Sequence, residues 1–532
     1  MISKLHIGCL CLFFNCIGMF AQDQEFFRGK VLDQKTGEPV VFATVRILGQ
    51  AKGVITNMDG SFRLPLEYRE AGESIAISSM GYEKKEYELQ RLSPKEINII
   101  YLAQGVFDLS EAVVRAKDKR RRLSARRIVQ KAIESIPGNY PTTSFSTIGY
   151  YRDYQFNEGD YINLNEGIME VYDQGFDQLD DATSEIQVLN FGLNTDFKQD
   201  SMARSAYDYD NYKKIIKKAY LRAYGGNEFR ILRIHDAIRN YNVFSYDYIK
   251  ILKNDLIKNH NFIRSADSYS DNEALYGIKF WQIHLNYRAH GEIFISKKDF
   301  SIHRLEYTMY DAKRTNKEKE KNKHGHKQKV IFDIMTEYRR TNNKMYLNYI
   351  SFHNSFEVRK PPKFAVDSTL VNMPGGYYTL YFNNPVDSAS AINPKNYDII
   401  YQKRKFKIDK IEVFTDSIRL YGDPAFKQIL YNTRGEIATL TNKGKNAEAQ
   451  QMFELGVDNV MDVYGNLVNE PDIYEYQQFR EFFTQRIKPD NRAPFDGQFM
   501  DREKPIFNDQ PMIKPDDYRE YWMNTPLSES IN

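Results

Sequence analysis

The sequence has very little cysteine. Its three cysteines, Cys9, Cys11 and Cys16, all lie within the first 16 of 532 residues. If the segment through residue 21 is removed, no cysteine remains, and this excludes disulfides, zinc–thiolate sites and a cysteine nucleophile from the mature chain.

Long apolar runs are also missing after the N-terminus, so we expect no membrane helix there. The N-terminal segment itself combines Lys4, an apolar run from Ile7 to Phe20 and the small residue Ala21. This pattern predicts a signal peptide over residues 1–21. The residues before Cys9 and Cys16 do not form a lipobox, which argues against lipidation. We therefore expect export to the periplasm or the outer membrane, or alternatively to the extracellular surface.

No excess of one charge sign is present, because 74 basic residues face 71 acidic ones. This balance predicts no nucleic-acid partner. Two local runs are basic: the linker over 105–123, which contains KDKRRR, and the loop over 313–329, which has eight Lys or Arg against two Glu. Either run is a solvated surface segment or a contact for anionic lipid head groups. The loop residues named for that contact are Lys317, Lys319, Lys321, Lys323 and Lys327.

Aromatic residues are abundant: the chain has 38 Tyr and 34 Phe, with only 2 Trp. Tyr and Phe favour strands, and 532 residues are too many for one ordinary core. The expected fold class is mostly β and multidomain: a prealbumin-like sandwich, a mixed β/α curved sheet, and an Ig-like sandwich.

The segment over 26–104 alternates short apolar runs with turns. In TNMDGSF, Asp59 and Gly60 predict a tight turn, and Gly81 marks another in SSMGYEKKEYEL. Together with GKVLDQKTGEPVVFATVRILG, these motifs resemble the carboxypeptidase-regulatory-like domain of Bacteroidetes-type envelope proteins. The resemblance implies a seven-stranded accessory sandwich without peptidase chemistry. In many outer-membrane receptors such a domain precedes a plug and barrel, which are not apparent in this sequence.

The segment over 124–365 combines helices and hairpins. Ser124 can cap a helix, and a second helical pattern covers 209–223, with Ile215 and Ile216 on one face and lysines on the other. A further helix is expected over 244–257. The hairpins over 277–310 and 328–358 are similar to the half-barrel of lipoprotein carriers, and the likeness covers about 140–360. It implies a curved sheet able to hold an acyl chain. The alternative is a sheet filled by its own Tyr and Phe side chains.

The segment over 371–470 resembles bacterial Ig-like domains described from S-layer proteins. The motifs are FNNPVDSASAINPKNYDIIY and VDNVMDVYGNLVNE, with Gly465 at a turn that needs positive φ. The resemblance implies a spacer or protein-contact module. The remaining 471–532 predict a helix over YEYQQFREFFTQRI and then an extended, proline-rich tail.

Motifs for catalysis and metal binding are absent or poorly placed. The HxxE pair His303 and Glu306 falls in an expected strand, where residues three apart face opposite sides. His324 and His326 lie in the lysine-rich loop, which does not preorganise a metal. The remaining histidines of interest, on or near expected strands, are His284, His290 and His353. We therefore assign no catalytic residue, metal or cofactor, and we expect no enzyme.

These features favour a noncatalytic envelope protein for binding or assembly at the outer membrane, with an envelope protein as partner. Three alternatives remain open. A periplasmic lipid or lipoprotein carrier would use the curved sheet, a carbohydrate-binding protein would use exposed tyrosines, and a cryptic hydrolase would use carboxylates that a single sequence does not single out.

Overall fold

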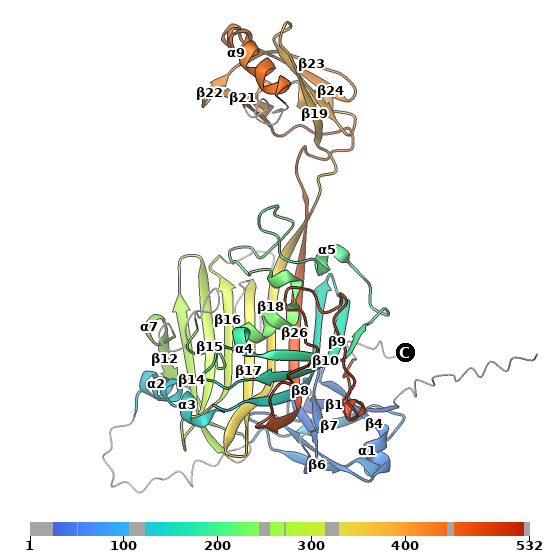
Figure 1. Ribbon diagram of the computed structural model, residues 1–532, viewed down its shortest axis with the longest axis vertical. Helices are drawn as coiled ribbons and strands as arrows, with labels where there is room; N and C mark the ends of the chain where they lie inside the picture. The colour runs from blue at the N-terminus through green and yellow to red at the C-terminus, as the bar shows by residue number, and fades with distance from the viewer. Residues whose placement is uncertain are drawn as a thin grey trace, which may run out of the picture. The chain divides into compact units, whose positions relative to one another are not determined.

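A computed structural model describes residues 25–50, 52–105, 123–243, 256–270, 273–313, 329–443 and 452–525 (Figure 1). The expected signal peptide, most of the basic linker, the lysine-rich loop and most of the expected helix over 244–257 lie outside these residues. The chain divides into two bodies. The first contains residues 1–200, 221–354 and 477–532, and the second contains 201–220 and 355–476. Both are built mainly of strands, as the expected fold class requires. Within the described ranges, no helix is both long enough and apolar enough to cross a membrane.

The first body begins with a seven-stranded sandwich. One of its sheets has the order β4-β1-β7, and the other has the order β3-β2-β5-β6. Alternating burial along β1 reflects one face turned into the core and one turned outward. The strands are β1 (Phe26–Asp33), β2 (Thr44–Ile47), β3 (Gly53–Ile55), β4 (Ser61–Pro65), β5 (Ser74–Ser78), β6 (Lys85–Glu88) and β7 (Asn98–Leu102), with a short helix α1 (Leu66–Glu70) after β4.

Most of the first body belongs to one wide sheet with the main strand order β10-β9-β8-β26-β18-β17-β16-β15-β14-β12. Of the strands of this sheet, β11 and one end each of β18 and β26 fall in the second body. Antiparallel hairpins connect β14 through β18, as their alternating sequences predict. The twelve strands are β8 (Phe145–Asn157), β9 (Asp160–Asp173), β10 (Glu185–Leu193), β11 (Lys214–Ile215), β12 (Asn261–Arg264), β13 (Ser268–Ser270), β14 (Glu273–Ile283), β15 (Tyr287–Ser296), β16 (Ile302–Asp311), β17 (Val330–Thr341), β18 (Lys344–Lys360) and β26 (Asp472–Pro489).

Short helices pack on one face of this sheet, which we call the helix-covered face. Phe229 of α6 (Glu228–Ile234) contacts Tyr151 and Phe482, with ring centroids 4.8 and 5.3 Å away. At the other end of α6, His235 stacks on Phe352. The remaining helices of this body are α2 (Ala125–Glu134), which is capped by Ser124 as expected, α3 (Ile136–Asn139), α4 (Asp180–Thr183) and α7 (Ile257–Asn259).

The sandwich packs on the opposite face, which we call the sandwich-covered face. Ile55 and Phe42 of the sandwich form an apolar cluster with Met335, Tyr349 and Phe483 of the sheet. Because both faces are covered, the inner strands are buried along almost their whole length, and β8 and β9 show little alternation.

The prediction of a helix in YEYQQFREFFTQRI is wrong, because this segment forms the central strand β26 between β8 and β18. The domain expected over 124–365 is therefore discontinuous and needs this distant strand. The proline-rich tail after β26 lies against the first body, where Trp522 is 2% exposed within the core of the sandwich. Its indole Nε1 donates a hydrogen bond to the Arg63 carbonyl at 3.3 Å.

The second body contains two sheets around one apolar core. A four-stranded sheet has the order β19-β20-β24-β23, and a three-stranded sheet has the order β22-β21-β25. The strands are β19 (Val366–Asn372), β20 (Tyr377–Phe382), β21 (Tyr397–Tyr401), β22 (Arg404–Phe406), β23 (Ile408–Val413), β24 (Ser417–Gly422) and β25 (Phe453–Val457), and the helices include α5 (Ser201–Arg204), α8 (Ser388–Ala391) and α9 (Pro424–Asn442).

The helix expected over 209–223 is also wrong. This segment is the short strand β11 with turns around it, and Tyr212 and Lys218 have positive φ values of 54° and 66°. Lys214, expected on an exposed lysine face, is instead fully buried. Pairing of β11 with the end of β18 overrides the helical period of the sequence.

Candidate functional site

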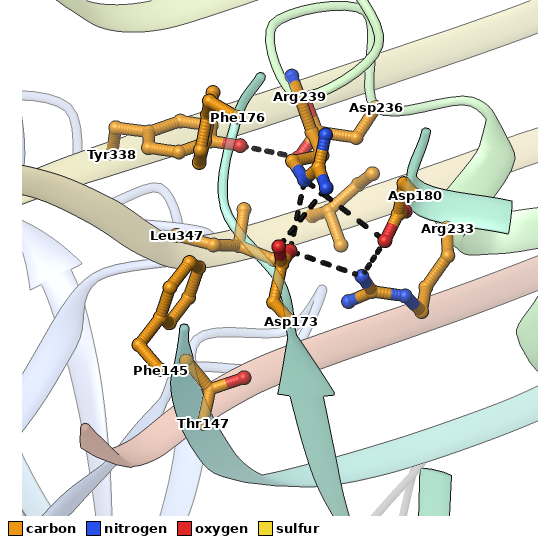
Figure 2. A pocket seen from close by; sticks show the side chains of 11 residues that line it. Phe145, Thr147, Asp173, Phe176, Asp180, Arg233, Asp236, Arg239, Tyr338 and Leu347 are labelled. Atoms are coloured by element: carbon orange, nitrogen blue, oxygen red, sulfur yellow. Dashed lines mark hydrogen bonds and ion pairs between the residues drawn. The ribbon is translucent and has the colours of Figure 1, made fainter. Parts of the chain in front are cut away.

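Four charged residues meet at the helix-covered face of the large sheet (Figure 2). Asp173 is the last residue of β9, Asp180 begins α4, Arg233 lies in α6, and Arg239 follows that helix. Arg239 binds Asp173 with both sides of its guanidinium group, with Nε–Oδ2 and Nη2–Oδ1 distances of 2.8 and 2.9 Å. Arg233 is paired with Asp180. These contacts join β9, α4 and α6.

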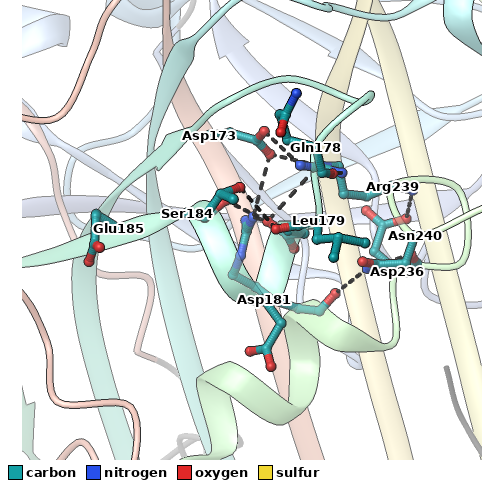
Figure 3. A network of polar contacts seen from close by, with 12 residues as sticks. Asp173, Gln178, Leu179, Asp181, Ser184, Glu185, Asp236, Arg239 and Asn240 are labelled. Atoms are coloured by element: carbon teal, nitrogen blue, oxygen red, sulfur yellow. Dashed lines mark hydrogen bonds and ion pairs between the residues drawn. The ribbon is translucent and has the colours of Figure 1, made fainter. Parts of the chain in front are cut away.

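Backbone groups complete the network (Figure 3). Arg239 also donates to the carbonyls of Gly175 and Gln178, at 2.9 and 3.0 Å. Burial opposes ionisation of Asp180, but the two arginines outweigh it and lower the pKa of this carboxyl group. The cluster therefore fixes the turn between β9 and α4 as a charged, closed network.

Asp236 is a second buried carboxylate at this cluster. Its Oδ2 accepts a 2.7 Å hydrogen bond from the Tyr338 hydroxyl, and its Oδ1 accepts from the backbone N–H groups of Ile238 and Arg239. Burial raises the pKa of Asp236 to about 6. This carboxyl group therefore binds a proton at a higher pH than an ordinary aspartate does.

Almost no empty space remains beside these groups. The cavity at the cluster has a volume of about 20 Å³, enough for a single water molecule. Sites for small organic ligands usually measure about 300–1,000 Å³. Phe145, Phe176 and Leu347 fill the apolar side of the cavity. This region of the sheet therefore holds its own side chains and has no room for an acyl chain.

Another set of buried charges lies along β8 and β26. Arg152 and Glu481 pair on the sandwich-covered face, with Nη2–Oε2 at 2.7 Å and side chains only 1% and 6% exposed. On the helix-covered face, Arg480 pairs with Glu228 and donates to Asn354. These pairs hold the central strand to its neighbours and to α6.

An open cleft lies between the sandwich and the large sheet, with a volume of about 780 Å³. We call it the sandwich cleft. Polar and charged groups of both signs line it, including Glu83 and Lys84 from the sandwich and Glu337, Arg339 and Arg340 from the sheet. Its size lies within the range for ligand sites.

Glu273 is an acid of the sandwich cleft that contacts three polar side chains. It lies 3.4 Å from His303 Nε2 and 3.2 Å from Arg340 Nη2, and it accepts from the Ser296 hydroxyl. The neighbouring His303 is the main cause that lowers the pKa of Glu273 far below its usual range. This acid is therefore ionised at any physiological pH and fixes the cleft wall.

The sandwich is held at this cleft by specific polar contacts. Arg46 of β2 donates to the side chain of Asn348 at 2.5 Å and lies over the ring of Phe483, 5.2 Å from its centroid. In the tail, Asn524 donates to the Ile55 carbonyl and accepts from the Arg63 backbone. Arg46 and Asn348 therefore join the sandwich to the sheet, and Asn524 joins the tail to the sandwich.

The turn residues singled out from the sequence lie in loops of the two bodies. Asp59 accepts from Ser61, and Gly60 has φ of 78°, where a Cβ would lie 2.5 Å from the Val31 carbonyl oxygen. Gly81 and Gly465 both have φ of 85°, as their predicted turns require. The five lysines of the basic loop, Lys317, Lys319, Lys321, Lys323 and Lys327, lie outside the described residues.

The histidines considered for metal binding lie apart from one another. His303 faces Glu273, whereas Glu306 pairs with Arg304. The remaining three stand beside different aromatic rings: His284 by Tyr287, His290 by Tyr310, and His353 by Phe479. Over the described ranges, no group of three or more His, Cys, Asp or Glu is placed to hold a metal. His324 and His326 fall outside those ranges.

Sequence reasoning did not find the cluster of Asp173, Asp180, Arg233 and Arg239. Its members are separated by up to 66 positions, and none belongs to a spaced motif. The pairing of Asp180 and Asp181 at the start of a short helix is an ordinary N-terminal pattern. Only the packing of α4 and α6 on β9 brings these charges together.

Comparison with known families identifies the first domain. Residues 27–114 match the family described as the CarboxypepD_reg-like domain, and this agrees with the resemblance carried by the motifs of that segment. The match covers the sandwich and not the rest of the chain. No curated protein matches the chain.

Three solved structures show a distant likeness to part of the chain. A LolA superfamily protein from Nitrosomonas europaea is 8% identical, with a TM-score of 0.18, over 44% of this chain and 86% of its own. A domain provisionally described as an outer membrane lipoprotein-sorting protein, from Vibrio parahaemolyticus, is 9% identical, with a TM-score of 0.18, over 43% and 85%. A DUF1329 family protein from Desulfovibrio piger is 7% identical, with a TM-score of 0.19, over 43% and 86%.

Proposed function

We propose that this chain is a noncatalytic binding or assembly protein of the cell envelope, acting as an accessory or scaffold at the outer membrane. The observation that carries the proposal is the filled region beside the charged cluster on the helix-covered face, where the cavity is about 20 Å³. Buried Arg and Asp side chains there are used to join β9, α4 and α6. The expected N-terminal signal peptide supports the placement in the envelope.

The sandwich cleft is the proposed binding surface. Its volume of about 780 Å³ and its mixture of charges suit a polypeptide segment of a partner protein, which carries both charge signs and many hydrogen-bonding groups. The described residues present Glu83 and Lys84 as exposed groups at one side of the cleft. An envelope protein that inserts a loop or terminus here would contact both the sandwich and the sheet.

The test is affinity purification of the mature protein from gently solubilised envelope, followed by mass spectrometry of everything retained. We expect a stoichiometric envelope protein. The double charge swap Glu83→Lys and Lys84→Glu should reduce its recovery at unchanged net charge. The matched control is Lys95→Glu with Glu96→Lys, which swaps two exposed charges of the same sandwich away from the cleft.

Three results would contradict the proposal. Recovery of the protein alone would remove the assembly role, and equal loss of the partner in both charge-swapped variants would remove the cleft as its site. Organic extraction that releases stoichiometric lipid from the purified mature protein would favour the carrier alternative, for which the cavity at the charged cluster leaves no room.

A further inference from the structure

A second cleft lies within the second body, between α5, the residues before β11 and the end of β18. We call it the proline cleft. Its volume is about 570 Å³. The residues that the argument uses are Met202, Tyr212, Lys213, Arg359, Lys360 and the prolines at 361, 362 and 471.

The proline cleft combines apolar walls with positive charge. Met202, Tyr212 and the three prolines give it carbon surfaces, and proline contributes no backbone N–H group. Its charged lining residues are three cations, Lys213, Arg359 and Lys360, with no Asp or Glu among the residues that line it. This composition suits a ligand that has an anionic group joined to an apolar part.

Arg359 has hydrogen-bonding capacity left for such a ligand. Its Nη2 lies 3.4 Å from Glu357, a long contact, and Glu357 is shared with Lys217 at 3.2 Å. The Nε of Arg359 is buried and has no hydrogen-bond partner among the described residues. A guanidinium group has five donors in a planar fork that matches the oxygens of phosphate or carboxylate.

Local folding fixes these groups in place. The Arg359 backbone N–H donates to the Lys213 carbonyl at 2.9 Å, and this joins the two cationic residues across the β11–β18 pairing. Beneath them, the buried Lys214 donates to the carbonyls of Ala203 and Ser205, at 2.7 and 2.8 Å. Lys214 therefore anchors the turn that carries Met202 and adds positive charge near the wall of the cleft.

We infer that the proline cleft binds the head group of an anionic, phosphate-bearing amphiphile, with Lys213, Arg359 and Lys360 around the phosphate and the prolines against its apolar part. This site is independent of the sandwich cleft and of the proposed partner protein. An inorganic phosphate ion offers the same charge chemistry but would leave most of about 570 Å³ unfilled. A lipid head group with the start of its chains is therefore the assigned source.

The test uses the full mature chain in co-sedimentation with vesicles of phosphatidylglycerol and phosphatidylcholine, compared with vesicles of phosphatidylcholine alone. We expect binding to the anionic vesicles, reduced roughly tenfold or more by Lys213→Gln with Arg359→Gln. The matched control, Lys218→Gln with Arg222→Gln, removes two cations from the same segment outside the cleft lining and should change binding less than threefold.

A second variant distinguishes loss of the binding site from misfolding caused by the Arg359 substitution. Lys213→Glu changes an exposed side chain, and it should weaken vesicle binding with an unchanged thermal unfolding transition. Equal losses in the cleft and control variants would overturn the site in favour of diffuse attraction. No binding to anionic vesicles would also overturn it. Saturable binding of inorganic phosphate, lost in the cleft variants without any vesicle binding, would overturn the lipid assignment and identify free phosphate as the ligand.

Discussion

Replacement of Asp153 by Asn should stabilise the protein at alkaline pH. Asp153 lies in β8 on the helix-covered face, is 3% exposed, and accepts hydrogen bonds from the Tyr151 hydroxyl and the Asn165 amide at 2.8 and 3.0 Å. Burial is the main cause that raises its pKa from 3.8 to about 7, and the negative charge of Glu228 adds to the shift. The folded protein therefore favours the protonated form of this carboxyl group.

The size of the effect follows from the difference between the folded and unfolded pKa values. Below pH 4 the carboxyl group is protonated in both states and contributes no difference in stability. As the pH rises to about 7, the unfolded state loses its proton first, so the folded state becomes progressively less stable. Above that pH the full cost is present, about 4 kcal/mol for a pKa raised from 3.8 to about 7.

Asparagine keeps the shape of Asp153 but carries no charge. We expect Asp153→Asn to equal the wild type near pH 4 and to gain about 2–4 kcal/mol at pH 8, since the amide replaces the carboxylate contacts incompletely. The free energy of unfolding is measured in guanidinium chloride at pH 4.5, 6 and 8, with Trp281 and Trp522 as fluorescence probes.

The contrasting control is Asp173→Asn, which leaves Arg239 without its bidentate partner. It should destabilise the first body by about 3–5 kcal/mol at both pH 6 and pH 8. The reasoning is refuted if Asp153→Asn shows no gain at pH 8, or if its effect on the free energy of unfolding is the same at pH 4.5 and pH 8.

Three further predictions test the packing and the charged loop. Trp522→Ala should lower the free energy of unfolding by about 3–5 kcal/mol, because the indole lies within the sandwich core. Limited proteolysis should then cleave the tail and the sandwich faster than in the wild type. Unchanged cleavage would show that the tail does not hold the sandwich. Gly60→Ala should lower the thermal unfolding temperature, since φ is 78° and the added Cβ would meet the Val31 carbonyl oxygen. The expected loss of stability is about 1–3 kcal/mol. A variant as stable as the wild type in calorimetry would contradict this turn geometry. Replacing the loop lysines by Gln should leave binding to anionic vesicles within threefold of the wild type if the proline cleft is the lipid site, and a larger loss would assign that binding to the loop. The residues changed in this last variant are Lys317, Lys319, Lys321, Lys323 and Lys327.

Local sequence patterns were sufficient to predict the fold wherever one face of a strand meets a core and the other meets solvent. The first sandwich could be predicted from its alternation and from turns such as Asp59 and Gly60, because glycine at positive φ is a local requirement. The helix over 125–134 could be predicted in the same way, since Ser124 caps it and its apolar residues share one face.

Local sequence patterns gave wrong predictions where other parts of the protein cover both faces of a strand. In β26, Arg480 and Glu481 lie on opposite faces, and each has a buried partner of opposite charge. The segment therefore shows no alternation, and its Gln, Arg and Glu residues resemble those of a helix. The prediction that Lys214 is exposed was wrong for a related reason. The carbonyls that accept its hydrogen bonds become its neighbours only when β11 pairs with β18.

The sequence by itself determined the β-rich class of this protein, its CarboxypepD_reg-like first domain and the absence of cysteine chemistry after the N-terminal segment, because composition and local spacing carry that information. Only the tertiary structure decided how the charges are used. The cluster of Asp173, Asp180, Arg233 and Arg239 and the two clefts are formed by residues far apart in the chain. The cluster depends on the packing of α4 and α6 on β9, the proline cleft on the pairing of β11 with β18, and the sandwich cleft on the packing of the sandwich against the sheet. No short window of sequence specifies these contacts.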